Sequence, residues 1–141
     1  MKIIIIGVPL QKQSARFAKM GKFMRSYQPK EVTNWTAQAK IQVINQLPEP
    51  WTPIEEPIII KKLTFVFPPL KSWSKKKRLA LENGIKIFKD KKPDLDNLQK
   101  NLFDVCNKLV WSDDAQIVRI ESMEKIHGLQ PRIELVIENG Q

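Results

Sequence analysis

The order of apolar and polar residues predicts β-strands along much of the chain. Short runs rich in Ile, Val and Phe that end near Gly, Pro or Asn are typical of strands. Such runs occupy residues 2–8, 57–67, 84–92, 117–120 and 132–138, and the last two are expected to form a hairpin. The first run is apolar almost throughout and is therefore expected to be buried on both faces. The second is expected to bury one face, interrupted by Lys61 and made of Ile59, Leu63, Phe65 and Phe67.

Apolar residues three and four positions apart predict helices between these strands. The helices are expected at residues 29–47, from Ser72 or Ser74 to about residue 82, and at residues 97–109. Asp96 is placed to cap the last helix. The first helix is expected to bury Ala37, Ile41, Ile44 and Leu47. The last is expected to bury Leu95, Leu98, Leu102, Val105, Cys106 and Leu109 and to expose Lys100, Asn101, Asp104 and Lys108.

These elements fit one α+β domain spanning residues 1–141, with a mixed β-sheet flanked by helices. A chain of 141 residues is long enough for one core. The Pro-rich segment 49–57 is a short connector between elements. The single cysteine, Cys106, cannot form an internal disulfide, and no apolar run approaches the roughly 20 residues of a membrane span. A cytoplasmic protein without membrane contact is expected, with His127 in a surface loop and Cys106 in the core.

The charge of the chain points to a polyanionic partner. The chain has 24 Lys and Arg against 15 Asp and Glu, a net charge of +9 and a pI of about 9.7. No acidic residue occurs before Glu31, and a solvated basic surface is the alternative interpretation of each cluster. The candidate DNA-binding residues are Lys12, Arg16, Lys19, Lys22, Arg25, Lys75, Lys76 and Lys77.

Four aspartates bracket the last predicted helix in this otherwise basic chain. Asp94 and Asp96 precede it, and Asp113 and Asp114 follow it. Carboxylate oxygens are ligands that Mg²⁺ prefers, and a bound Mg²⁺ promotes phosphodiester hydrolysis. If the sheet returns Asp113 or Asp114 to the first two acids, the group forms a metal site. Taken singly, each aspartate is also explained as a helix cap or a turn residue.

Three segments in order resemble the signature of the RusA-type Holliday junction resolvases. They are Lys-Pro-Asp-Leu-Asp-Asn-Leu-x-Lys at residues 92–100, Asp104, and Trp-x-Asp-Asp-Ala-Gln-Ile-Val at residues 111–118. The opening strand with Gly7-x-Pro9, the basic segment 72–78 and the turn at 125–128 extend the resemblance over nearly the whole chain.

This resemblance implies a RusA-like fold and a homodimeric endonuclease of DNA recombination and repair. Such an enzyme binds branched DNA and, with Mg²⁺ or Mn²⁺, nicks two opposing strands of a four-way junction. The resemblance implies that Asp94, Asp96 and Asp114 are metal ligands, with Asp113 as the alternative third ligand. It assigns Lys100 to the scissile phosphate. No small-molecule cofactor is implied, and because family members are often phage-derived, a prophage origin belongs to the expectation.

Two other functions compete with this one. The first is a protein that binds branched DNA without cutting it, with the acids serving as caps and turns. The second is a nuclease that prefers flaps or replication forks.

Overall fold

The protein is an α+β structure built on a mixed β-sheet, as the sequence predicts. The computed structural model describes residues 1–11, 16–21, 23–27 and 29–139, with the backbone alone for residues 16–20 and 23–27. The strands are β1 (Lys2–Ile6), β2 (Arg16–Met20), β3 (Phe23–Tyr27), β4 (Ile58–Phe67), β5 (Ile87–Phe88), β6 (Ile117–Ile120), β7 (Met123–His127) and β8 (Arg132–Asn139). The helices are α1 (Lys30–Gln46), α2 (Lys75–Glu82) and α3 (Leu95–Cys106), with a 3₁₀ turn at Asp114–Gln116.

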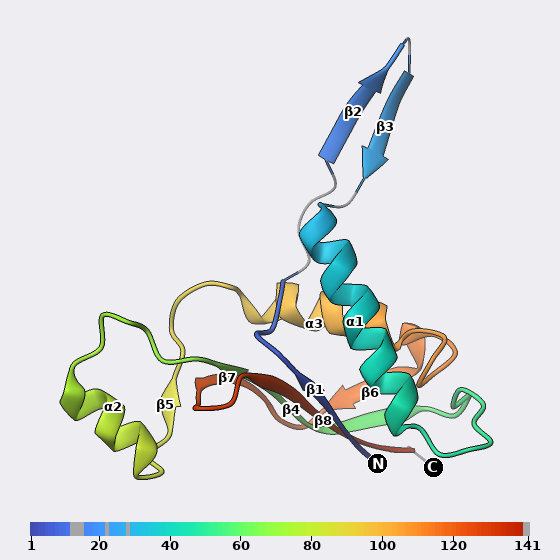
Figure 1. Cartoon of the computed structure of the whole chain (residues 1–141). Coiled ribbons are helices and arrows are strands. Elements are labelled where there is room, and N and C mark those ends of the chain that lie inside the picture. The colour runs from blue at the N-terminus through green and yellow to red at the C-terminus, as the bar shows by residue number, and fades with distance from the viewer. Residues whose placement is uncertain (12–15, 22, 28, 140–141) are drawn as a thin grey trace.

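Six strands form one sheet around β4. Their order is β1-β8-β4-β7-β5, and β6 also pairs with β4. The β1–β8, β8–β4 and β5–β7 pairs are antiparallel, whereas β4 is parallel to β6 and β7. Helices α1 and α3 cover one face of this sheet (Figure 1). None of the helices in the described residues is long and apolar enough to cross a membrane.

The core lies between the sheet and the two helices. The fully buried Trp111 packs edge-on against Phe103, with ring centroids 5.7 Å apart. The aliphatic face of α3 meets the inward residues of β1, β4 and β8 in the same cluster, and Cys106 is buried there as expected. This packing fixes α3 against the sheet.

The strand β4 changes face part-way along its length. Ile58 and Ile60 are buried in its first half and Leu63 in its second, because a bulge at Lys61 interrupts its register with β8. The expectation that Ile59 belongs to the buried face is therefore wrong.

The C-terminal strands differ from the expected hairpin. Strands β6 and β8 do not pair with each other, because each pairs with β4, and the unexpected strand β7 lies between them in sequence. Within the predicted strand at residues 84–92, only Ile87–Phe88 is a strand. His127 ends β7 and is 7% exposed, so its predicted place in a surface loop is wrong.

Two glutamines of α1 bind the edge of the sheet. Gln46 accepts from the amide of Ile4 at 2.9 Å and donates to the carbonyl of Ile4 at 2.6 Å. Gln42 makes the same pair of hydrogen bonds with Ile6, at 2.8 and 3.0 Å. The two amides therefore satisfy alternate residues of the edge strand β1, as a neighbouring strand would.

This glutamine pair explains why the expected buried stripe of α1 is wrong. The helix turns Gln42 and Gln46 toward β1, and its buried residues are Val32, Ala39 and Val43. Ile41 and Ile44 are consequently 53% and 52% exposed. The edge position of β1 likewise leaves Ile6 51% exposed, so burial of this strand on both faces is wrong.

Residues 16–27 contain a hairpin that the sequence did not predict. Strands β2 and β3 pair with Arg16 opposite Tyr27 and Met20 opposite Phe23, and Gly21 at the turn has φ +62°. The hairpin projects from the N-terminal end of α1, away from the sheet (Figure 1). The segment that follows β1 is held by Trp35 and Asn101, which donate to the carbonyls of Val8 and Leu10 at 3.1 and 2.8 Å. Asn101 is 2% exposed, so its expected place on the outer face of α3 is wrong.

We expect Gln46→Ala to lower the free energy of unfolding by about 1–2 kcal/mol, because two backbone groups of Ile4 lose their protein partner. Urea unfolding measures this change. Gln38→Ala is the matched control, since Gln38 is exposed two turns earlier on α1 and its side chain makes no hydrogen bond within the described part of the chain. Equal effects of the two substitutions would contradict the role of Gln46.

Candidate functional site

Asp94 and Asp96, the acidic pair, lie at the N-terminus of α3. The helix begins at Leu95 with Asp94 as its N-cap residue, so the expectation that Asp96 caps the helix is wrong. Asp94 makes no side-chain hydrogen bond that caps α3, although aspartate at this position usually does. Both residues are exposed. The positive end of the helix dipole favours negative charge at this place.

Lys125 of β7 holds the loop that leads into the acidic pair. Its ammonium group donates to the carbonyl oxygens of Lys91 and Pro93 at 2.7 and 2.8 Å. Its own carbonyl accepts from the amide of Lys89 at 3.0 Å. The start of α3 is thereby attached to the sheet through one partly buried side chain. The sequence signal for this role is a lysine that alternates with Met123 and His127 and so lies on the same face of the strand.

Lys100 lies one turn beyond the acidic pair on the same helix. It is exposed, and its position four residues after Asp96 places the two side chains on the same side of α3. An ammonium group here can stabilise negative charge near the acidic pair.

Asp113 and Asp114 lie beyond the other end of α3. Asp113 caps the 3₁₀ turn, accepting from the amide of Ala115 at 3.0 Å, in a capping box with Gln116. Asp114 accepts a 2.7 Å hydrogen bond from the indole of Trp111. Burial, with a smaller contribution from the nearby Asp114 charge, raises the pKa of the Cys106 thiol far above its usual range. The turn role considered for Asp113 is thus observed.

The two groups of acids do not meet within one chain. Helix α3 has 12 residues, which at 1.5 Å per residue separate its ends by about 18 Å. In the part of the chain that the structure describes, no three His, Cys, Asp or Glu side chains are grouped to hold a metal ion. The expectation that folding returns Asp113 or Asp114 to the acidic pair of its own chain is therefore wrong.

The expected DNA-binding residues lie on two separate extensions. Lys75, Lys76 and Lys77 form the exposed first turn of α2, capped by Ser74, which accepts from the amide of Lys77 at 3.2 Å. Arg16 and Lys19 belong to β2 and Arg25 to β3, whereas Lys12 and Lys22 lie outside the described residues. The hairpin and α2 extend from different sides of the body, and the start of α3 lies between them (Figure 1).

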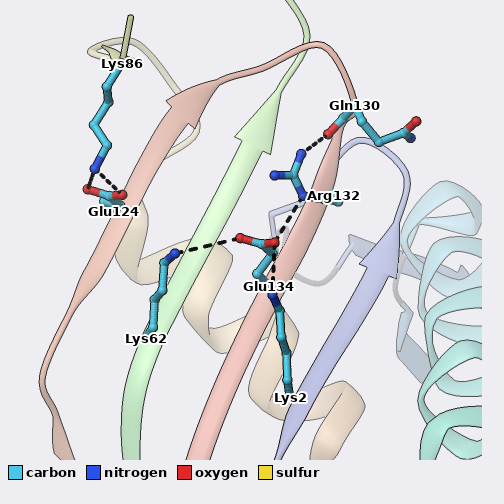
Figure 2. A network of polar contacts seen from close by, with 7 residues as sticks. All are labelled: Lys2, Lys62, Lys86, Glu124, Gln130, Arg132 and Glu134. Atoms are coloured by element: carbon cyan, nitrogen blue, oxygen red, sulfur yellow. Dashed lines mark hydrogen bonds and ion pairs between the residues drawn. The ribbon is translucent and has the colours of Figure 1, made fainter. Parts of the chain in front are cut away.

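The face of the sheet opposite α3 carries neutralised charges. Glu134, whose side chain is 13% exposed, lies within 4.0 Å of Lys2, Lys62 and Arg132. Lys86 pairs with Glu124 at 2.8 Å (Figure 2). Because the cations of this face have acidic partners, it is less suited to a polyanion than the face with the acidic pair.

His127 is not placed to act as a base. Its Nδ1 lies 2.9 Å from the carbonyl oxygen of Pro68, and its ring is buried. Burial, with smaller contributions from the charges of Lys89 and Lys77, lowers its pKa. It supports the structure instead.

A family model and two relatives match the chain. The model described as "Endodeoxyribonuclease RusA" matches residues 7–138. A protein of Bacillus subtilis (strain 168) named YqaN is 38% identical over 64 residues, covering 45% of this chain and 44% of that protein. The "Crossover junction endodeoxyribonuclease rusA" of Lactococcus phage r1t is 49% identical over 51 residues, covering 36% of this chain and 38% of that protein. The matched segments thus span less than half of either relative.

We expect Lys125→Met to loosen the loop before the acidic pair, because each hydrogen bond from a charged donor contributes about 1.5–3 kcal/mol. The amides of Lys89 and Leu98, whose hydrogen bonds flank this loop, should exchange with deuterium at least about 10-fold faster. Lys125→Arg keeps a cationic donor and is the control. Unchanged exchange in the methionine variant would show that the loop does not depend on Lys125.

Proposed function

The chain belongs to the RusA endodeoxyribonuclease family, and we propose that it is a Mg²⁺-dependent endonuclease that resolves four-way DNA junctions by paired, symmetric nicks. The observation that carries the proposal is the acidic pair, exposed at the start of α3 and not used to cap it. The net charge of +9 favours a DNA substrate. The reaction would serve DNA recombination and repair.

The acidic pair has the chemistry of a magnesium site. Mg²⁺ in proteins is commonly held by one or two carboxylates together with waters and substrate phosphates. Asp94 supplies one carboxylate from the N-cap position of α3 and Asp96 a second from its first turn, and Mn²⁺ suits the same oxygen ligands. When bound, the ion would neutralise phosphate charge and activate water.

The protein's own residues would bind and orient the DNA at this place. The first turn of α3 presents backbone N–H groups that suit a phosphate oxygen. The ammonium of Lys100 would stabilise the negative charge that develops at the scissile phosphate. Lys125 would keep the acidic pair in position through the loop that it holds.

A third carboxylate would have to come from a second copy of the chain. One chain keeps Asp114, and its alternative Asp113, at the far end of α3. In a two-fold dimer, each contact is made twice, so the acidic pair of each subunit could meet Asp114 of the partner subunit. A homodimer also has the approximate two-fold symmetry of a four-way junction. It would provide the two identical sites that paired nicks require. The exposed Ile41 and Ile44 of α1 are candidate interface residues.

DNA contacts are proposed for both basic extensions. The hairpin would contribute Arg16, Lys19 and Arg25, and α2 would contribute its first turn. Lys12 and Lys22, which lie outside the described residues, are proposed to bind DNA as well. Their positions on different sides of the acidic pair would allow one protein to contact separate arms of a junction (Figure 1).

A non-catalytic protein that binds branched DNA is the second candidate. It is favoured by the absence of a three-acid group within one chain, among the residues that the structure describes. In that case, the acidic pair would only stabilise the N-terminus of α3.

Incubation of the protein with synthetic four-way junctions separates these functions. We expect symmetric nicks with Mg²⁺ and none with EDTA. Asp96→Asn should reduce cleavage more than about 100-fold, because losing even an outer-shell partner of a metal costs about 10–100-fold. Binding in EDTA should be kept or strengthened, since a charge that repels phosphate is removed.

Asp90→Asn is the control for that variant, because it removes one exposed carboxylate shortly before the acidic pair. Retention of the junction without cleavage at any Mg²⁺ or Mn²⁺ concentration would favour the binding protein. Faster cutting of flaps or forks than of junctions would replace the proposed substrate.

The shared site predicts complementation between two inactive variants. In a mixed dimer of Asp96→Asn and Asp114→Asn subunits, one site loses both acids and the other is complete. We therefore expect mixing to restore single nicks, whereas either variant alone is inactive. If each site uses its own Asp114, the mixed dimer has no complete site and stays inactive; subunit exchange is verified by mass spectrometry.

A further inference from the structure

Three aromatic rings form a row beside the loop that Lys125 holds. The rings of Trp73 and His127 are in edge contact, with centroids 4.6 Å apart. His127 lies directly opposite Phe67 in the β4–β7 pairing, so these two side chains share one face of the sheet. We call Phe67, His127 and Trp73 the aromatic row. It joins the segment before α2 to the end of the sheet.

A lysine lies over each end of the aromatic row. The Lys77 ammonium is 4.4 Å from the centre of the Trp73 ring, and the Lys89 ammonium is 5.0 Å from the centre of the Phe67 ring. Both distances are within the range of cation–π attraction. The rings therefore hold two flexible cations at defined places.

These two cations are not neutralised by an ion pair in the described part of the chain. Neither Lys77 nor Lys89 takes part in an ion pair among the described residues, whereas Lys86, three positions before Lys89, pairs with Glu124 on the opposite face. Burial, and then the nearby Lys125, lower the pKa of Lys89. The neighbouring Asp90 raises this pKa, but its effect is smaller than that of burial or of Lys125. The cations therefore still repel one another, and a bound anion would relieve this repulsion.

The aromatic row is attached to the acidic pair. The amide of Lys89 donates to the carbonyl of Lys125, whose ammonium holds the residues just before Asp94. His127 follows Lys125 by two positions on β7 and so shares its face of the strand. A ligand on the row is thus in a fixed relation to the acidic pair.

We propose that the aromatic row is a binding site for the sugar–phosphate backbone of the DNA strand that enters the acidic pair, with Lys77 and Lys89 contacting its phosphates. The assignment adds Lys89 and Trp73 to the DNA-binding residues, with the buried Phe67 and His127 supporting them from below, and rests on the proposed function for the identity of the strand. The half-buried Trp73 offers an apolar surface for a sugar or a base. A lysine ammonium is a mobile point charge, which suits contacts to phosphate that do not depend on sequence.

The salt dependence of junction binding tests this site without cleavage. Binding is measured in EDTA by fluorescence anisotropy between 50 and 200 mM salt. Each lost phosphate contact should reduce the slope of log K against log salt by about 0.9. We expect this reduction for Lys89→Gln and for Lys77→Gln, and about twice as much for the double variant.

Lys86→Gln is the matched control, because it removes the same charge from the same segment and its ammonium also lies over a ring, 5.6 Å from that of Phe88. Its slope should remain that of the unchanged protein. Thermal unfolding verifies that each variant is folded, and the exposed Lys77 provides a second test should Lys89→Gln be unstable. The proposal is overturned if the slopes of the Lys77 and Lys89 variants equal that of the control.

The result of the salt-dependence measurement does not depend on whether the protein cleaves DNA. A reduced slope in a protein that never cuts DNA keeps the aromatic row as a DNA-binding site and removes the resolvase function. Metal-dependent cutting with an unchanged slope keeps the enzyme and removes this site.

Discussion

The length of α3 limits what one chain can do with its acids. Because its core face is packed against the sheet and its first residue is fixed by the loop that Lys125 holds, neither end can approach the other. The acidic pair lies at the start, and Asp114 beside Cys106 at the end. A site that needs both groups must therefore be completed from outside the chain. This constraint connects the chemistry to assembly.

Strand β7 is the element that relates the basic surface to the acidic pair. Two residues on one face of β7 are polar. Lys125 donates a hydrogen bond to the loop before α3, and the ring of His127 is in edge contact with the ring of Trp73. The segment before α2 and the start of α3 are distant in sequence from β7 but are positioned by it. A change in β7 would consequently affect both the proposed DNA contacts and the position of the acidic pair.

Regular local patterns allowed prediction of the helices, β4 and the Ser74 cap, whereas tertiary partners decided the rest. The face of α1 could not be predicted, because Gln42 and Gln46 are turned toward the edge of β1, a strand that is distant in sequence. Strand β7 was missed because it has two polar residues on one face, the partly buried Lys125 and the buried His127. The acidic pair was recognisable as a motif, but the placement of the remaining acids depended on the whole path after α3.

The glutamine pair on α1 also determines how the sheet can meet other molecules. An uncovered edge strand offers its amides and carbonyls to any extended chain, which leads to edge-to-edge aggregation. Here the outward backbone groups of Ile4 and Ile6 are already occupied by side-chain amides. An extended chain could add at this edge only by displacing the two amides, so helix α1 protects β1 with side chains of its own chain.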